Sequence, residues 1–334
     1  MSTIAVALSP ALRSLFFTAT AWDELASLGR VRVPPDDADL GDPATLAALL
    51  DDAEIVITGW GCAPLSASVL AAAPRLRLLA HTGASVKPFV TPESYARGVR
   101  VTQAGAAMAH AVGEQALALT LALLHRVHRF DHALRTGLGW AAAKAAPPRQ
   151  ELRDSLVGVV GASRTGRAYI GLVRALGARV QVYDPYLTAP QAGELGVARA
   201  GLDELLATST VVSLHAPVLP STLGMLGARE LGLLPDWGLL VNTARSALVD
   251  GAALLAALRS GRIDAALDVF DGEPLPVEHP LRRLPNVLLT PHEAAGTVQA
   301  RRRGGEIVLA ELARFQRGEP LRHEVLEADL DRLG

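Results

Sequence analysis

Three short polar motifs in the second half of the sequence contain side chains that could act together. Arg245 lies in the stretch NTARS, Glu273 in DVFDGEP and His292 in TPHEAA, and each stretch comes after an apolar run of strand length. In open parallel sheets, ligands bind beyond the carboxyl ends of the strands. We therefore expect the guanidinium, the carboxylate and the imidazole to converge at one crevice.

Each of these side chains suits one step in the reduction of a 2-oxo acid. Arg245 can hold a carboxylate through paired hydrogen bonds and polarise the adjacent carbonyl. His292 can protonate the carbonyl oxygen as hydride arrives, and Glu273 can orient the ring and favour imidazolium. Taken singly, the Arg is usually a surface ion pair, the Glu a loop acid and the His structural. The hypothesis therefore rests on the set.

A dinucleotide-binding unit is indicated by the segment from Leu156 to Asp184. An apolar run is followed by a glycine-containing turn, a helical stretch and a second apolar run that ends at an acidic residue. Gly161 permits the tight turn, Gly166 lets the helix pack close to the strand, and the free N–H groups at the helix N-terminus can receive a pyrophosphate. The residues assigned to this turn are Gly161, Ser163, Arg164, Thr165 and Gly166.

The end of the second strand indicates which dinucleotide is preferred. Asp184 can accept hydrogen bonds from the adenosine ribose and would repel a 2′-phosphate, and Pro185 supplies no cation, so we expect NAD over NADP. Ser163 replaces the middle glycine of the fingerprint. Its Cβ should push the pyrophosphate slightly away, although its hydroxyl could donate a hydrogen bond. An ordinary turn without a ligand is the alternative, and the complete strand, helix and acid pattern disfavours it.

The elements around these motifs alternate between short aliphatic runs and helical stretches. This alternation predicts parallel sheets with crossover helices, in two Rossmann-like or flavodoxin-like α/β domains with a cleft between them. Residues 1–102 and 293–334 are expected to form a discontinuous substrate domain, and residues 103–292 the NAD-binding domain. Strands are predicted at 4–8, 31–33, 54–58, 76–80, 99–102, 156–160, 179–183, 211–214, 239–242, 265–269 and 287–289.

Three further segments complete the expected organisation. Residues 106–134 read as one long helix that could bridge the domains, residues 136–149 as a loop, and residues 297–316 as a helix that returns to the first domain. His125, His128 and His132 share a helix face, but a surface or subunit interface is favoured over a metal site because no carboxylate pattern accompanies them. Arg301–Arg303 are most simply a solvated face.

Composition excludes several classes of protein. The 334 residues suit about two domains of roughly 150 residues each, and a net charge of −2 gives no general reason to bind nucleic acid or an anionic membrane. The single cysteine, Cys62, excludes an internal disulfide framework and a multi-cysteine metal site. Neither a signal peptide nor an uninterrupted apolar span of ~18 residues is seen. We expect a cytoplasmic protein.

Taken together, these motifs give a sequence that resembles the D-isomer-specific 2-hydroxyacid dehydrogenase family over nearly its whole length. In that family an Arg–Glu–His set does the chemistry, and Arg245, Glu273 and His292 match it. The stretch HTGASVKPF resembles the loop whose backbone N–H groups take the substrate carboxylate. The resemblance therefore implies substrate contacts from Ala84, Ser85 and Val86, and cofactor contacts from His215, Ala216, Pro217, Thr243, Ala244 and Asp268.

The sequence also departs from the family pattern. Besides Ser163, Ser246 follows the catalytic Arg where Gly is common, Glu293 adds an acid beside His292, and Ala295 stands where Gly is common. None of these changes removes a catalytic group. The resemblance further implies a homodimer, and we expect no C-terminal regulatory domain.

The function expected from the sequence is hydride transfer between NAD(H) and a small 2-oxo or 2-hydroxy acid of the glyoxylate or hydroxypyruvate type. His292 would be the acid/base, assisted by Glu273, and Arg245 the substrate anchor. The alternative is a non-enzymatic, corepressor-like protein that senses NAD(H) on the same fold. The intact Arg245–Glu273–His292 set favours the enzyme, because a sensor need not keep all three. The expected partners exclude nucleic acid, membrane and metal.

Overall fold

The computed structural model describes residues 2–332, which form two compact units. Within the described part, the first unit contains the residues up to 108 together with those from 296 onward, and the second contains residues 109–295. The expected domain boundaries, after residues 102 and 292, lie a few residues before the observed ones, after residues 108 and 295. Each unit has its own parallel sheet and its own hydrophobic core.

The first unit is built on a five-stranded parallel sheet in the order β2-β1-β3-β4-β5. This is the flavodoxin-like strand order. Every residue of β1, β3 and β4 is buried, as expected for parallel strands with helices on both faces. The strands are β1 (Thr3–Ala7), β2 (Arg30–Arg32), β3 (Ile55–Thr58), β4 (Leu78–His81) and β5 (Arg100–Gln103).

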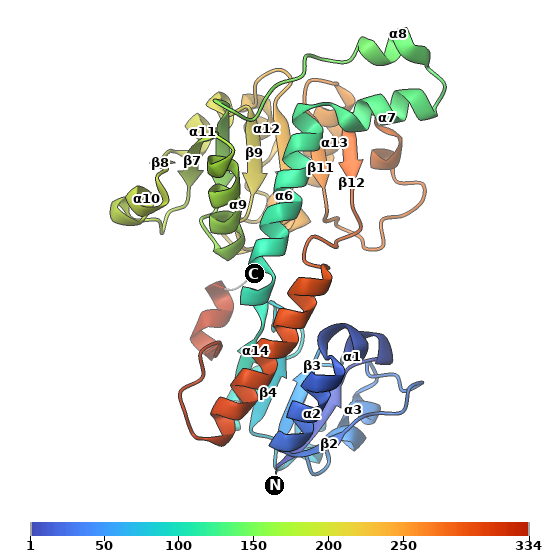
Figure 1. Ribbon diagram of the computed structural model, residues 1–334, viewed down its shortest axis with the longest axis vertical. Coiled ribbons are helices and arrows are strands. Elements are labelled where there is room, and N and C mark those ends of the chain that lie inside the picture. The colour runs from blue at the N-terminus through green and yellow to red at the C-terminus, as the bar shows by residue number, and fades with distance from the viewer. Residues whose placement is uncertain (1, 333–334) are drawn as a thin grey trace. The chain divides into compact units, whose positions relative to one another are not determined.

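Helices from both ends of the chain cover this sheet. On one face, α14 (Val298–Gln316) packs against α1 (Pro10–Phe16) and α2 (Ala19–Leu28), so the red helix of Figure 1 lies among the blue elements. The helix predicted to return to the first domain therefore does so. The other face is covered by α3 (Pro43–Leu50), α4 (Ala67–Ala72) and α5 (Pro92–Ala96), and the unit also contains the 3₁₀ turns η1 (Gly105–Ala107) and η4 (Glu327–Arg332).

The second unit has a seven-stranded parallel sheet in the order β12-β11-β10-β9-β6-β7-β8. The chain order reverses between β6 and β9, which is the switch point of a Rossmann fold, where ligands bind. The strands are β6 (Leu156–Val160), β7 (Arg179–Tyr183), β8 (Ala198–Arg199), β9 (Val211–Leu214), β10 (Leu239–Asn242), β11 (Asp264–Leu267) and β12 (Val287–Leu289). The two-residue β8 is not predicted by the sequence, because it is too short to show a pattern.

Helices cover both faces of this second sheet. Helix α6 packs along α9, while α11, α12 and α13 contact one another in succession. The stretch Gly105–Leu124 is long and apolar enough to cross a membrane by length and composition, yet 56% of its 18 most apolar consecutive residues are buried inside the structure, as in a core helix. The helices are α6 (Ala109–Leu124), α7 (Val127–Arg135), α8 (Gly139–Lys144), α9 (Arg164–Ala175), α10 (Ala189–Leu195), α11 (Leu202–Thr208), α12 (Ala228–Leu233) and α13 (Gly251–Arg259), with 3₁₀ turns η2 (Ser246–Leu248) and η3 (Pro280–Arg283).

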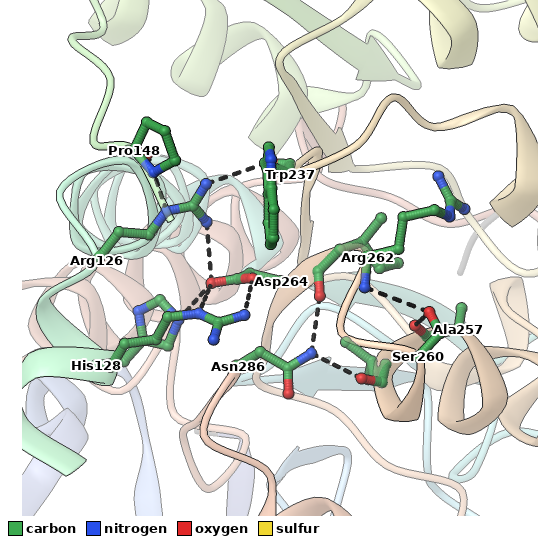
Figure 2. Close-up of polar contacts among 12 residues, drawn as sticks. Arg126, His128, Pro148, Trp237, Ala257, Ser260, Arg262, Asp264 and Asn286 are labelled. Carbon is green, nitrogen blue, oxygen red and sulfur yellow. Dashed lines mark hydrogen bonds and ion pairs between the residues drawn. The ribbon is translucent and has the colours of Figure 1, made fainter. Parts of the chain in front are cut away.

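The prediction of one continuous helix over 106–134 is wrong. Arg126 adopts a left-handed conformation with φ 55° and separates α6 from α7. Its buried side chain places Nη1 3.0 Å from Oδ2 of Asp264 and donates from Nη2 to the Trp237 carbonyl at 3.3 Å (Figure 2). These tertiary contacts outweigh the local preference for a helix. The predicted loop over 136–149 likewise contains the short helix α8.

The expectation that the three histidines lie at a surface or subunit interface is wrong for His128. Its Nε2 lies 2.9 Å from Oδ2 of the fully buried Asp264, which Arg129 also holds through two hydrogen bonds. Burial alone would raise the pKa of Asp264, but the bonds from Arg129 and His128 and the charge of Arg126 lower it. Asp264 is therefore an ionised structural anchor. Among residues 2–332 no group of three or more potential ligands could hold a metal.

Candidate active site

The structure brings Arg245, Glu273 and His292 to the same edge of the second sheet. They follow β10, β11 and β12, which are neighbouring parallel strands whose ends are paired at Asn242 with Leu267 and at Leu267 with Leu289. The three side chains therefore project from consecutive loops at the carboxyl edge. All three belong to the second unit.

His292 and Glu273 form a direct pair. Nδ1 of His292 lies 2.6 Å from Oε2 of Glu273, and the other carboxylate oxygen accepts the Phe270 N–H at 2.9 Å. Burial opposes ionisation of Glu273, but these hydrogen bonds and the charges of His292 and Arg245 hold its pKa below the ordinary value. The ring is thereby fixed through Nδ1, and Nε2 is left for a reactant.

Asp268 supports the loop that carries His292. Its carboxylate is fully buried and accepts hydrogen bonds from the Thr290 hydroxyl, from Glu293 N at 3.1 Å and from Ala294 N at 2.9 Å. His292 itself has φ 56°, a left-handed conformation that a non-glycine residue keeps only when its surroundings impose it. Asp268 is therefore a positioning residue here, and the contact with a nicotinamide carboxamide stays a prediction.

Arg245 is held by a residue that the sequence analysis missed. The Asn242 side chain accepts from Ala244 N at 3.0 Å and donates to the Arg245 carbonyl at 2.9 Å, which fixes the turn after β10. Burial lowers the pKa of Arg245, while the charge of Glu273 opposes that shift. An asparagine at a strand end is a common turn-forming residue, and this was the signal from which its role in the turn after β10 could have been predicted.

Two features at this edge leave space and hydrogen-bonding capacity for ligands. A cavity of about 500 Å³ adjoins the His292–Glu273 pair and is lined by apolar side chains that include Phe270, Leu275 and Leu289. The buried hydroxyl of Thr243 has no hydrogen-bond partner among the described residues. An orphaned hydroxyl at the end of β10 fits a bound cofactor, because buried polar groups are normally satisfied.

The turn after β6 has the geometry of a dinucleotide cradle. Gly161 has φ 98°, and a Cβ there would lie 2.6 Å from Ala216 N; a Cβ on Gly166 would lie 2.1 Å from the Gly161 carbonyl. Only glycine fits at either position. Ser163 is the N-cap of α9, and its Oγ accepts the Gly166 N–H at 3.3 Å. The Ser163 oxygen thus caps the helix, and its hydroxyl proton can donate to a neighbouring group such as Thr165 Oγ1 at 3.1 Å.

His215 supports this turn from the neighbouring strand. Its Nδ1 lies 3.3 Å from Oγ1 of Thr165, and its Nε2 lies 2.9 Å from Oγ of Ser213. Burial lowers the pKa of His215 to about 3, so the ring is neutral and carries no charge into the turn. Ala216 follows it directly against Gly161, while the cofactor contacts that the resemblance implies for His215, Ala216 and Pro217 stay predictions.

Asp184 lies where the ribose acid was expected, and it also braces the turn. Its carboxylate accepts hydrogen bonds from Ala162 N at 2.7 Å and from Tyr186 N at 2.8 Å. A cavity of about 330 Å³ beside it is also lined by Arg199 and Glu204. This cation is not predicted from the sequence, where only Pro185 directly follows Asp184, because Arg199 belongs to the unpredicted strand β8.

The loop expected to take the substrate carboxylate belongs to the first unit. Ala84, Ser85 and Val86 follow β4, and among the described residues their backbone N–H groups have no hydrogen-bond acceptor. Three adjacent free donors at the carboxyl edge of a parallel sheet can bind an anion. Their contact with the substrate carboxylate stays a prediction.

Comparison with known proteins places these features in a family. Residues 117–294 match the NAD-binding domain of the D-isomer-specific 2-hydroxyacid dehydrogenases. A D-3-phosphoglycerate dehydrogenase of Mycobacterium leprae is 36% identical over 265 residues, which cover 79% of this chain and 49% of that protein. The chain thus spans about half the length of such relatives.

Two further relatives match over more of their length. A glyoxylate reductase of Korarchaeum cryptofilum is 35% identical over 259 residues, which cover 77% of this chain and 78% of that protein. The crystal structure of a protein from Thermus thermophilus superposes with a TM-score of 0.81 at 30% identity, covering 97% of this chain and all of that one. With the fold, the turn and the matched residues in agreement, the chain belongs to the D-isomer-specific 2-hydroxyacid dehydrogenase family.

Proposed function

We propose that this protein transfers hydride between NAD(H) and a small 2-oxo or 2-hydroxy acid of the glyoxylate or hydroxypyruvate type. The observation that carries the proposal is the His292–Glu273 pair, 2.6 Å apart, at the same sheet edge as Arg245. When bound, NAD(H) supplies or accepts the hydride. The protein's own side chains then have to anchor the acid and move one proton.

Each catalytic residue has a role that follows from its contacts. Because Glu273 holds Nδ1 of His292, Nε2 is the atom that gives the proton to the substrate oxygen in reduction and removes it in oxidation. Arg245 binds the carboxylate and carbonyl oxygens through its planar guanidinium. In the first unit, the free N–H groups of Ala84, Ser85 and Val86 are assigned to a substrate carboxylate, as the resemblance implies.

The cofactor is assigned to the residues around the glycine turn and the neighbouring strand ends. Asp184 takes the ribose hydroxyls, the N-terminus of α9 takes the pyrophosphate, and the orphaned Thr243 hydroxyl hydrogen-bonds to the nicotinamide half. The remaining contacts are assigned to Gly161, Ser163, Arg164, Thr165, Gly166, His215, Ala216, Pro217, Ala244 and Asp268.

We further propose that the protein is a cytoplasmic homodimer without nucleic-acid or membrane partners. Helices α7 and α8 and the turn between them contain exposed apolar side chains, with Leu134, Leu138 and Trp140 exposed by 49%, 60% and 70%. Light scattering should give twice the chain mass for the wild type, and Leu138→Asp with Trp140→Asp should reduce it. A monomeric wild type would contradict the dimer.

The enzymatic proposal is tested by adding glyoxylate, hydroxypyruvate or pyruvate to the protein with NADH. Loss of NADH absorbance is expected in the wild type, and His292→Asn should abolish it while the Kd for NADH stays within about threefold. Tight NADH binding with no turnover of any 2-oxo acid would instead support the NAD(H)-sensing alternative.

A further inference from the structure

A chain of buried polar side chains runs through the second unit to the glycine turn. It begins at Thr120 on α6, whose hydroxyl oxygen lies 2.7 Å from that of Tyr169 on α9. Burial raises the pKa of Tyr169, against the effect of its hydrogen bonds with Thr120 and with Ser213 of β9. Oγ of Ser213 lies 2.9 Å from Nε2 of His215, and Nδ1 of that ring lies 3.3 Å from Oγ1 of Thr165. The chain thus connects the core helix α6 to the first turn of α9.

The direction of these hydrogen bonds follows from the protons that need an acceptor. Thr120, Tyr169 and Ser213 are fully buried, and within residues 2–332 the Thr120 hydroxyl has Tyr169 as its one hydrogen-bond partner. A buried hydroxyl proton without an acceptor is costly, so Thr120 donates to Tyr169, and Tyr169 donates to Ser213. The Ser213 proton is then left with Nε2 of His215 as its acceptor.

The ring of His215 is therefore protonated on Nδ1. Burial lowers its pKa to about 3, so at neutral pH the ring carries a single N–H, and Nε2 already accepts from Ser213. Nδ1 consequently donates to Oγ1 of Thr165. With the opposite tautomer, Nδ1 would instead accept the hydroxyl proton of Thr165, and that proton would be lost to any ligand.

The Ser163–Thr165 pair is left with one proton more than it uses. The two hydroxyl oxygens lie 3.1 Å apart, and each already accepts one hydrogen bond, Ser163 from the Gly166 N–H and Thr165 from His215. One of the two hydroxyl protons lies between the oxygens, in either direction, and the other has no acceptor in the described part of the chain. Both side chains are only partly buried, so this second proton can reach a ligand at the turn.

From this count we infer that the spare hydroxyl proton donates to the pyrophosphate of the bound dinucleotide, and that either Ser163 or Thr165 can supply it. The inference rests on the assignment of the glycine turn to NAD(H). Ser213 is then a positioning residue that acts through His215. A hydroxyl donor offsets the loss of the middle glycine, because the Cβ of Ser163 keeps the backbone further from a phosphate.

The redundancy of the pair is tested by calorimetry with ADP-ribose, which contains the pyrophosphate, and with adenosine, which does not. Ser163→Ala and Thr165→Val should each change the Kd for ADP-ribose by no more than about threefold, because the remaining hydroxyl still donates. The double variant should weaken ADP-ribose binding by at least about tenfold, as expected for a lost hydrogen bond to a charged group, and leave adenosine binding unchanged. Thr136→Val removes a hydroxyl of the same unit that donates to the His132 carbonyl at 2.8 Å, and it should change neither.

The tautomer of His215 is measured directly by NMR on wild-type protein containing ¹⁵N-labelled histidine. Nε2 is identified by its coupling to both ring C–H protons, and the signals missing in His215→Asn assign the ring. A protonated Nδ1 and a bare Nε2 are expected, and a protonated Nε2 would overturn the inference. This measurement needs no folded double variant.

The binding data separate failure of the inference from failure of the cofactor assignment. The inference is overturned if the double variant binds ADP-ribose like the wild type, if one single variant already shows the full loss, or if adenosine binding weakens equally. In each of these cases the assignment of the turn to NAD(H) stands. If the wild type binds neither ADP-ribose nor NADH, that assignment itself fails.

Discussion

Replacing Asp268 by asparagine should weaken the hydrogen bonds that hold the loop carrying His292 in place. Oδ1 of Asp268 accepts from Thr290 and Glu293 N, and Oδ2 accepts from Ala294 N. Asparagine can keep the oxygen on one side, but it then turns an NH₂ group toward the buried Ala294 N–H. Leaving this buried donor unsatisfied costs about 1–3 kcal/mol. In a unit of this size that lowers Tm by about 2–12 °C.

Activity should fall further than stability suggests, because His292 is displaced from the reacting oxygen. A misplacement of about 1 Å lowers the rate roughly 100-fold. Calorimetry, kcat/KM for glyoxylate and the Kd for NADH are the measurements, with the exposed Asp271→Asn as a control on the same strand-to-loop segment. A positioning role predicts a lower Tm and a lower kcat, and a change in the NADH Kd would report the cofactor contact that is also assigned to Asp268. An unchanged Tm and kcat would refute the positioning role.

Three other predictions concern the cofactor and the catalytic set. The wild type should have a higher kcat/KM with NADH than with NADPH, and equal values would contradict the assignment of Asp184 to the ribose. Asp184→Ala should lower the NADH/NADPH ratio of kcat/KM, because Arg199 is then free to bind a 2′-phosphate, and adding Arg199→Ala should raise the ratio again. Arg245→Lys should lower kcat/KM by about 100-fold through loss of the planar double contact, with NADH binding retained; near-normal turnover would exclude Arg245 as the anchor. The lowered pKa of Glu273 means that this carboxylate is ionised at every pH above about 4.3, the ordinary pKa of a glutamate. Glu273→Gln removes that charge and should therefore move the alkaline fall-off of kcat/KM for reduction to lower pH, measured where a deuteride isotope effect shows that chemistry is rate-limiting. An unchanged alkaline limb would argue against His292 as the proton donor.

The strands and the glycine turn could be predicted from the sequence because their determinants are local. Strand β6 has the predicted bounds Leu156–Val160, since a buried parallel strand is a continuous aliphatic run between turn residues. The position of Arg245, Glu273 and His292 at one edge followed from their places after three strands. Two of the features that remained hidden depend on residues more distant in sequence: Asp268 bracing the His292 loop, and Arg199 in the cavity beside Asp184. The bracing of Arg245 by Asn242 is local, and the turn-forming asparagine was the signal for it.

The helix break at Arg126 has a consequence for the order of folding. The left-handed turn between α6 and α7 has no glycine to favour it, and its partner Asp264 starts a strand more than a hundred residues later. In a nascent or isolated segment without β11, nothing opposes continuation of the helix through Arg126. We expect the segment to begin as one straight helix and to bend only when β11 docks. Substitutions at Asp264 should therefore mainly speed unfolding and leave the rate of folding little changed.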